Sequence, residues 1–202
     1  MEALAAGARA KGLKYAAQNM QHFLDGTGTV QKVHPQVLIH DLPGFKKQVN
    51  SDLSDLDCQL YGKAVSAYQA NGNQPINMSF RGPWKTYYAG PEESQDWFYA
   101  MGGFSYEISG YVTVEPPATP GGQPRAVMHY RLHVHDRYNW DTGTGVSIGP
   151  IDIPDTAQQR LHRTGLAQEY DIDGSTDLLT RTMSTTCGST VTNGPAGTDG
   201  GR

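Results

Sequence analysis

The most regular pattern in the chain is a helical spacing of apolar residues in its first third. Apolar side chains recur every three or four residues, at Phe45, Val49, Leu53, Leu56, Leu60, Ala64 and Tyr68. Because a helix turns once in about 3.6 residues, this spacing places all of them on one face. Asp41 is expected to cap the helix before Pro43, and Asn71 and Gly72 are expected to end it. The pattern predicts one long amphipathic helix that buries a single face.

A second helix is expected nearer the start of the chain. Residues 2–24 are rich in Ala, Lys, Gln and Met, their apolar residues fall near helical spacing, and Asp25 and Gly26 follow. We therefore expect a helical segment over residues 1–72.

After Pro75 the sequence changes to short runs of aromatic and β-branched residues separated by Gly and Pro. This texture is typical of antiparallel strands. Strands are expected over residues 99–115 and 125–138, joined by a hairpin loop with the sequence PPATPGGQP. A short helix around 157–162 and a closing strand over 166–172 are expected to follow.

Together these elements predict an α+β fold in which N-terminal helices pack on an antiparallel, open β-barrel-like sheet. The β-barrel-like domain is expected over residues 73–176. Residues 177–202 are expected to form a flexible polar C-terminal tail, because the last part of the sequence is too polar to pack.

The size and charge of the chain argue against several classes of function. It has 202 residues and a formal net charge of −4, so we expect no nucleic-acid partner. No apolar run is close to the roughly 20 residues that a spanning helix needs, and the start lacks the apolar core of a secretory signal. Cys58 and Cys187 are too few and too far apart for a disulfide framework or a zinc site.

The expected strand over 125–138 carries a carboxylate at an unusual position. Side chains alternate between the two faces of a strand, so Asp136 and Tyr138 share a face with the apolar residues Leu132 and Val134. A carboxylate on an apolar face is costly unless it is paired or used, for example as a base or a metal ligand. The structural alternative is that Asp136 caps the loop that follows.

A second cluster pairs His162 with Arg163. An imidazole acting as acid or base beside a guanidinium that clamps phosphate oxygens is suited to phosphoryl chemistry. The structural alternative is the solvated end of a surface helix.

The two clusters together resemble the activity domain of colicin M and the M-type bacteriocins, over roughly residues 76–175. That family carries Asp-x-Tyr-Asp followed shortly by His-Arg on an open β-barrel, and the matching residues here are Asp136, Tyr138, His162 and Arg163. The family's second Asp falls on Asn139, and the segment before His162 is longer than in the family. The resemblance implies Mg²⁺-dependent cleavage of the undecaprenyl-pyrophosphate bond of lipid II, the peptidoglycan precursor.

The resemblance also implies roles for individual residues. Asp136 and Asp141 would hold Mg²⁺, with Asp141 replacing the missing second Asp. His162 would act as acid or base, and Arg163 would neutralise charge on the leaving pyrophosphate. Tyr138 would orient a phosphate oxygen or the carboxylate.

A toxin of this class implies partners and a place of action. We expect lipid II as substrate, an immunity protein in the producer, and a carrier or a larger delivered polypeptide. The protein would be secreted or delivered, and it would act at the outer face of the target's cytoplasmic membrane, where it would block cell-wall synthesis. Several aromatic side chains could hold the isoprenoid chain or rest in the membrane interface, and core packing is the structural alternative for them. They are Trp84, Tyr87, Tyr88, Trp97 and Trp140.

Three other interpretations use different residues or no catalysis. The opposite face of the same strand carries His129, His133 and His135, which could bind zinc together with Asp152, Asp155 or His162. Spacing of the kind found in calcium loops occurs at Asp171, Asp173 and Asp177, where an ordinary Asp-Gly turn is the alternative. The last interpretation is a non-enzymatic β-domain that binds a partner.

Overall fold

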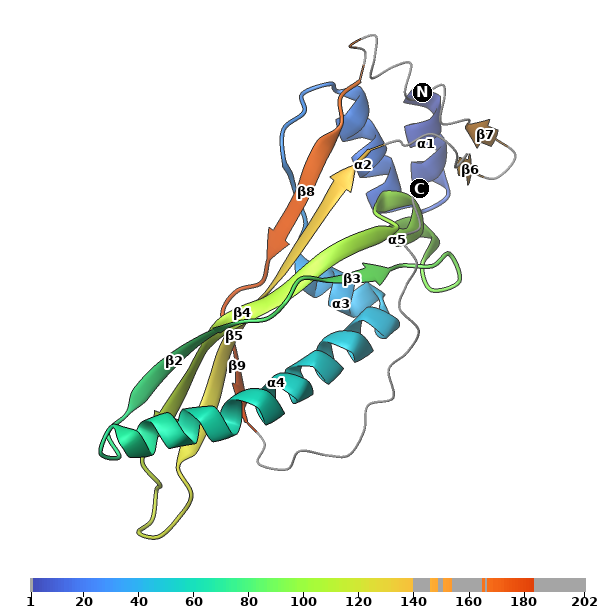
Figure 1. The fold of residues 1–202 in the computed structure, drawn as a ribbon. Helices are drawn as coiled ribbons and strands as arrows, with labels where there is room; N and C mark the ends of the chain where they lie inside the picture. Colours follow the sequence, from blue (N-terminus) through green and yellow to red (C-terminus); the bar gives the residue numbers. More distant parts are fainter. Residues whose placement is uncertain (1, 140–145, 149–150, 154–164, 166, 184–202) are drawn as a thin grey trace.

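The computed structural model describes residues 2–139, 146–148, 151–153, 165 and 167–183 (Figure 1). The short helix expected around 157–162 lies outside these residues. The helices are α1 (Glu2–Ala10), α2 (Lys14–Leu24), α3 (Pro35–Asp41), α4 (Pro43–Ala70) and α5 (Gln95–Ala100). The strands are β1 (Gln31–Lys32), β2 (Ile76–Arg81), β3 (Lys85–Tyr88), β4 (Gly103–Glu115), β5 (Arg125–Tyr138), β6 (Val146–Ile148), β7 (Ile151–Ile153), β8 (Tyr170–Ser175) and β9 (Leu179–Thr182).

Seven of the strands form one open sheet against which the helices pack, which confirms the predicted α+β class. The strand order is β1-β8-β5-β4-β2, with β3 also paired to β4 and β9 also paired to β5. All pairs within this sheet are antiparallel except β1 with β8, so the sheet is mixed rather than purely antiparallel. Strands β6 and β7 pair only with each other in the described part of the chain.

The two longest strands, β4 and β5, form the centre of the sheet. They pair without interruption from Ser105↔His135 to Glu115↔Arg125, as the predicted hairpin requires. In the middle of the ladder Gly110 lies against the backbone of His129, and a Cβ at this position would collide with it. Glycine is therefore needed there for the two strands to approach each other.

Alternation along β5 separates the sheet into two faces. One face is buried, and we call it the helix-covered face; on β5 it presents Ala126, Met128, Leu132, Val134, Asp136 and Tyr138. The other is the outer face, where β5 presents His129, Arg131, His133, His135 and Arg137. The two sets have the period of two that the sequence predicted for this strand.

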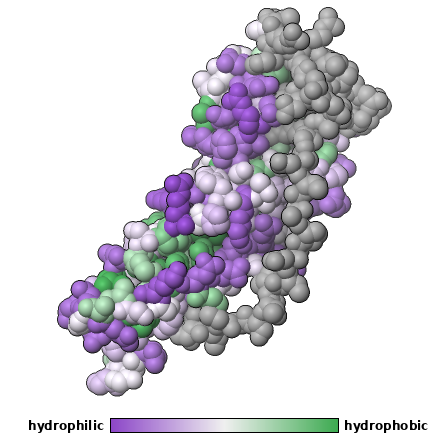
Figure 2. Space-filling view, in the orientation of Figure 1, coloured by the Kyte–Doolittle hydropathy of each residue, from purple (hydrophilic) through white to green (hydrophobic). Residues whose placement is uncertain are grey.

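The long helix α4 confirms the predicted helix and covers one half of the sheet. Its buried side chains include Phe45, whose ring packs 5.0 Å from that of Phe104 and 5.1 Å from that of Tyr106. Figure 2 shows hydrophilic side chains along α4 and a hydrophobic area between this helix and the strands. Leu56 and Phe80 are partly buried against the core. The predicted stripe of apolar residues is thus the face that holds α4 on β4.

Asp41 is not the N-cap of this helix, so that prediction was wrong. Leu42 takes the cap position and makes no side-chain cap bond, while Pro43 begins the helix. Asp41 is the last residue of α3, and its carboxylate accepts a hydrogen bond of 2.9 Å from Trp97 Nε1. Because the indole occupies that carboxylate oxygen, Asp41 connects α3 to α5.

The single helix predicted over residues 2–24 was also wrong. The chain forms two helices, α1 and α2, which are separated at Gly12. Gly12 has a φ of 79°, a left-handed conformation that ends α1.

Two boundaries in the last third also differ from the prediction. The closing strand expected over 166–172 is β8, Tyr170–Ser175, because Asp171 and Asp173 find basic partners on β5 and therefore remain in the strand. The tail expected from residue 177 begins with β9, which pairs with residues 127–130 of β5. Backbone pairing and the burial of Met183 hold this polar segment on the sheet.

The helical and β-rich parts predicted as separate segments share one hydrophobic core. Strand β1 lies within the first segment and pairs with β8 near the end of the chain. In the same helical segment, Tyr15 of α2 stacks on Trp97 of α5 at 4.1 Å. Among the helices of the described residues, none is both long and apolar enough to cross a membrane.

A buried ion pair connects β9 to α4. Arg181 Nε donates to Asp57 Oδ2 over 2.9 Å, and the Asp57 side chain is only 3% exposed. The other carboxylate oxygen of Asp57 has no hydrogen-bond partner among the described residues. Arg181 is therefore the cation that balances the buried Asp57 carboxylate.

Replacing Arg181 with Ala is expected to lower the free energy of unfolding by about 3 kcal/mol, because it leaves the Asp57 carboxylate buried without its cation. Urea denaturation measures this change. The matched control is Arg125→Ala, which removes a surface ion pair with Glu115 at 3.6 Å and is expected to cost less than about 1 kcal/mol. Equal losses in the two variants would contradict this interpretation of the Asp57 pair.

Candidate functional site

The end of β5 brings Asp136 and Tyr138 together on the helix-covered face, as the sequence predicted. Asp136 pairs with Ile172 of β8, and Tyr138 pairs with Tyr170. Asp136 is 9% exposed and Tyr138 is 1% exposed. A carboxylate is thus held at the border of the core, at the point where β5 ends.

The ring of Tyr138 belongs to an aromatic cluster beneath α2. It stacks on Tyr170 at 5.0 Å and lies 6.0 Å from Phe23. The hydroxyl of Tyr170 donates to the backbone carbonyl of Asn19 over 2.8 Å. These contacts fix the end of β5 against α2, so Asp136 is carried by a rigid part of the fold.

A cavity of about 250 Å³ lies next to this strand end. It is bounded by α2, β1, α3, α5 and β8, and its lining includes Ile172, the residue paired with Asp136. Lys14 and Trp97 contribute to other walls. The cavity and Asp136 therefore lie on the same side of the sheet.

The remaining predicted site residues, Asp141, His162 and Arg163, lie outside the described residues. So do Trp140 and Asp155, and the side chain of Asp152. The structure thus brings together two of the five predicted site residues, Asp136 and Tyr138, through their alternation on one strand.

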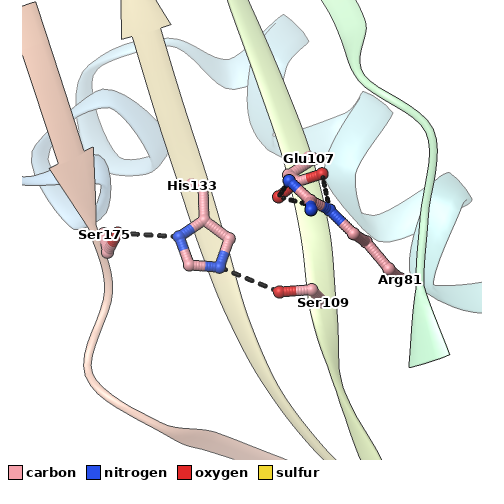
Figure 3. Close-up of polar contacts among 5 residues, drawn as sticks. All are labelled: Arg81, Glu107, Ser109, His133 and Ser175. Carbon is pink, nitrogen blue, oxygen red and sulfur yellow. Dashed lines mark hydrogen bonds and ion pairs between the residues drawn. The ribbon is translucent and has the colours of Figure 1, made fainter. Parts of the chain in front are cut away.

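The outer face carries a polar network that the sequence analysis did not find (Figure 3). His133 lies at its centre, with Nδ1 2.7 Å from Ser175 Oγ on β8 and Nε2 2.9 Å from Ser109 Oγ on β4. Both ring nitrogens are therefore engaged by hydroxyl groups from the two neighbouring strands. We call these three residues the Ser–His–Ser array.

Next to the array, Arg81 and Glu107 form a bidentate ion pair (Figure 3). Arg81 Nε donates to Glu107 Oε2 over 2.9 Å, and its Nη2 donates to Oε1 over 2.9 Å. Glu107 is 4% exposed, although it points to the outer face. The hydrogen bonds and the charge of Glu107 raise the pKa of Arg81 above its ordinary value.

The other basic residues on this face have partners as well. His135 Nδ1 lies 2.7 Å from Asp173 Oδ1, and Arg137 Nη1 donates to Asp171 Oδ1 over 2.9 Å. The hydrogen bond that Arg137 donates to Asp171 raises the pKa of Arg137. His129 Nε2 lies 3.2 Å from the hydroxyl of Thr113.

These contacts concern the described members of the two alternative metal sites. In the described part of the chain, no three His, Cys, Asp or Glu side chains are grouped so that they could hold a metal ion. His129, His133 and His135 each bond to different partners. Asp171 and Asp173 lie on strand β8 rather than in a calcium loop or an Asp-Gly turn.

The aromatic side chains named from the sequence divide into two groups. Trp97 is 2% exposed and belongs to the core, and Tyr87 is half-buried and donates to Glu93 Oε2 over 2.6 Å. Trp84 and Tyr88 are 47% and 45% exposed. Only the latter two, among the described residues in that group, are available to contact an apolar ligand.

Strand alternation on β4 could have revealed part of the outer-face network. Glu107, Ser109 and Thr113 are two or four residues apart and therefore share a face. Their contacts with Arg81, His133 and His129 depend on the register between strands. That register is not visible from the local pattern of one strand.

The chain matches no protein-family model, no curated protein and no solved structure. A functional assignment therefore depends on the chemistry of its own residues.

Replacing Glu107 with Gln is expected to lower the free energy of unfolding by about 1–2 kcal/mol, because a nearly buried, charge-assisted pair with Arg81 is lost. Thermal or urea unfolding measures the change. Glu115→Gln is the matched control on the same strand, since Glu115 is exposed and lies 3.6 Å from its partner. A Glu107→Gln variant as stable as the control would show that the bidentate pair contributes nothing.

Proposed function

We propose that this protein is an antibacterial toxin that hydrolyses the undecaprenyl-pyrophosphate linkage of lipid II in a Mg²⁺-dependent reaction. The proposal combines the resemblance to the colicin M activity domain with the position of one residue. That residue is Asp136, a carboxylate only 9% exposed, on the helix-covered face where β5 ends. Carboxylates held at the border of a core often serve as bases or metal ligands.

Mg²⁺ is consistent with the donors that the proposal uses. Mg²⁺ prefers hard oxygen ligands and is commonly bound by one or two carboxylates together with substrate phosphates. Asp136 supplies one carboxylate, on a strand end fixed by the aromatic cluster of Tyr138 and Tyr170. Asp141 would supply the second. When bound, Mg²⁺ would neutralise charge on the pyrophosphate.

The reaction adds water across the bond between the isoprenoid and the pyrophosphate. It gives undecaprenol and the pyrophosphorylated muropeptide. His162 would act as the acid or base that moves the proton, and Arg163 would hold the negative charge of the leaving pyrophosphate. In this proposal His162 would transfer the proton, while Arg163 and the metal-binding carboxylate would help to stabilise charge.

Tyr138 is proposed as a positioning residue. With 1% exposure and a ring stacked on Tyr170, it has no open path to a phosphate oxygen in this conformation. Its place two residues from Asp136, on the same face, suits it to fix the carboxylate instead. Of the two roles that the resemblance implied for Tyr138, burial favours the second.

A substrate anchored in a bilayer requires contact with the membrane surface. The exposed Trp84 and Tyr88 are proposed to contact the isoprenoid or the bilayer interface. The proposal also includes an immunity protein in the producer and a carrier or larger delivery polypeptide. The toxin would act at the outer face of the target's cytoplasmic membrane.

A second candidate is a non-enzymatic β-domain that binds a partner through the outer face. It is favoured by the Ser–His–Ser array and by the concentration of basic side chains on β5. The two candidates use opposite faces of the same strand, so substitutions on β5 can separate them.

The direct test is incubation of the purified protein with lipid II and Mg²⁺, followed by chromatography for undecaprenol and the pyrophosphorylated muropeptide. Asp136→Asn is expected to lower the rate at least about 100-fold, since it removes a carboxylate from the proposed site. Chelation by EDTA is expected to abolish the reaction.

The matched control is Asp171→Asn, which changes an outer-face carboxylate on the strand next to Asp136. It is expected to keep at least about half of the activity, because it affects only a surface pair with Arg137. Absence of product from the folded wild-type protein would overturn the enzymatic proposal. Equal activity of Asp136→Asn and wild type would remove Asp136 from the mechanism.

A further inference from the structure

Arg131 differs from the other arginines of the outer face in having no carboxylate partner. Arg81 is paired with Glu107, and Arg137 is paired with Asp171. Arg131 makes no ion pair with any described carboxylate. Its Nη1 instead donates a hydrogen bond of 2.7 Å to the backbone carbonyl of Thr176. A guanidinium has five N–H donors, so most of those of Arg131 remain available.

Arg131 lies directly beside the Ser–His–Ser array. It pairs across the strands with Ser109, whose hydroxyl is bonded to Nε2 of His133. Its carbonyl partner, Thr176, follows Ser175, whose hydroxyl is bonded to Nδ1 of His133. The guanidinium of Arg131 is therefore next to the imidazole of His133 on its own strand and to one serine hydroxyl on each neighbouring strand.

Arg81 adds a second guanidinium on the far side of Ser109, with which it is paired in the register of β2 and β4. The side chain of Arg81 is 69% exposed, while the side chain of Glu107, its partner, is 5% exposed. Glu107 neutralises Arg81 but lies beneath it. Ser109 is thus flanked on both neighbouring strands by arginines.

We propose that Arg131, Ser109, His133 and Ser175 form a binding site for a phosphate-type oxyanion on the outer face. Arginine donors match the acceptor oxygens of a phosphate, since one guanidinium can bind two of them at once. The serine hydroxyl that accepts a hydrogen bond from the N–H of His133 has its own proton left to donate to the anion. The negative charges of Asp173 and Glu107 are already balanced, since Asp173 is bonded to His135 and Glu107 to Arg81. The site is separate from the proposed catalytic end, because these side chains lie on the opposite face from Asp136.

The anion could be a free phosphate compound or the phosphate of a lipid headgroup. Both present the same oxygens, and the outer face is open enough at Arg131 to receive either. Titration of the isotope-labelled protein with inorganic pyrophosphate, followed by NMR, tests the free anion. Sedimentation with vesicles of phosphatidic acid, compared with vesicles of phosphatidylcholine, tests the headgroup.

Pyrophosphate or phosphatidic acid vesicles are expected to bind saturably, and the backbone amide signals of Ser109, His133 and Ser175 are expected to shift. Arg131→Gln is expected to weaken binding at least about tenfold, because it removes the unpaired guanidinium. Arg125→Gln is the matched control on the same strand, since Arg125 is already paired with Glu115. It is expected to change the affinity less than about twofold.

A second variant, Ser175→Ala, removes one hydroxyl without changing charge, and it is expected to weaken binding several-fold. It keeps the test valid if Arg131→Gln does not fold. Binding of the free anion alone would assign the site to a soluble phosphate compound, and Arg131-dependent binding of vesicles alone would assign it to a headgroup. Absence of binding to both probes, or equal binding by wild type and the variants, would overturn the proposal.

Discussion

The pairing of β4 with β5 is the constraint on which the rest of the structure depends. These strands are paired along nearly their whole length, and every other strand of the large sheet except β1 pairs with one of them. The close approach at Gly110 permits the ladder to continue past His129. Once this register is set, β8 and β9 follow along the free edge of β5, while β2 and β3 follow along β4. The positions of Asp136 and His133 relative to their neighbours are consequences of this single pairing.

The same alternation assigns different chemistry to the two faces of β5. The helix-covered face is apolar except at its end, where Asp136 reaches the border of the core. The outer face is polar, and cross-strand pairs satisfy most of its charges. Burial of Glu107 and of Asp57 is compatible with stability because each has an arginine within 2.9 Å. Arg131 stands apart from this pattern, because its guanidinium is held by a backbone carbonyl and not by a carboxylate.

Much of the fold could be predicted from local patterns, and the errors have physical causes. The bounds of β5 and the face of Asp136 followed from alternation over fourteen residues. Helix α4 followed from a long helical period, but its cap did not, since Trp97 takes the carboxylate of Asp41. The single helix predicted over residues 2–24 is divided at Gly12, whose left-handed φ of 79° ends α1.

Features that depend on long-range pairing could not be predicted. Strand β1 has two residues, and β9 has a polar sequence, so neither carries a local signal strong enough to identify it. The array around His133 joins residues of three strands, and its members are more than twenty residues apart in sequence. Only the register of the folded sheet brings them together. The shared face of Asp136 and Tyr138 was predictable because both belong to one strand.

The central claim is that the helix-covered end of β5 binds the pyrophosphate substrate with Mg²⁺. The most direct measurement is NMR of the isotope-labelled protein with Mg²⁺ and a lipid II analogue whose shortened isoprenoid makes it water-soluble. The account predicts Mg²⁺-dependent shifts of the amide signals of Asp136 and Tyr138 and of the segment that follows them. Shifts confined to other parts of the molecule, or no shifts at saturating analogue, would contradict it.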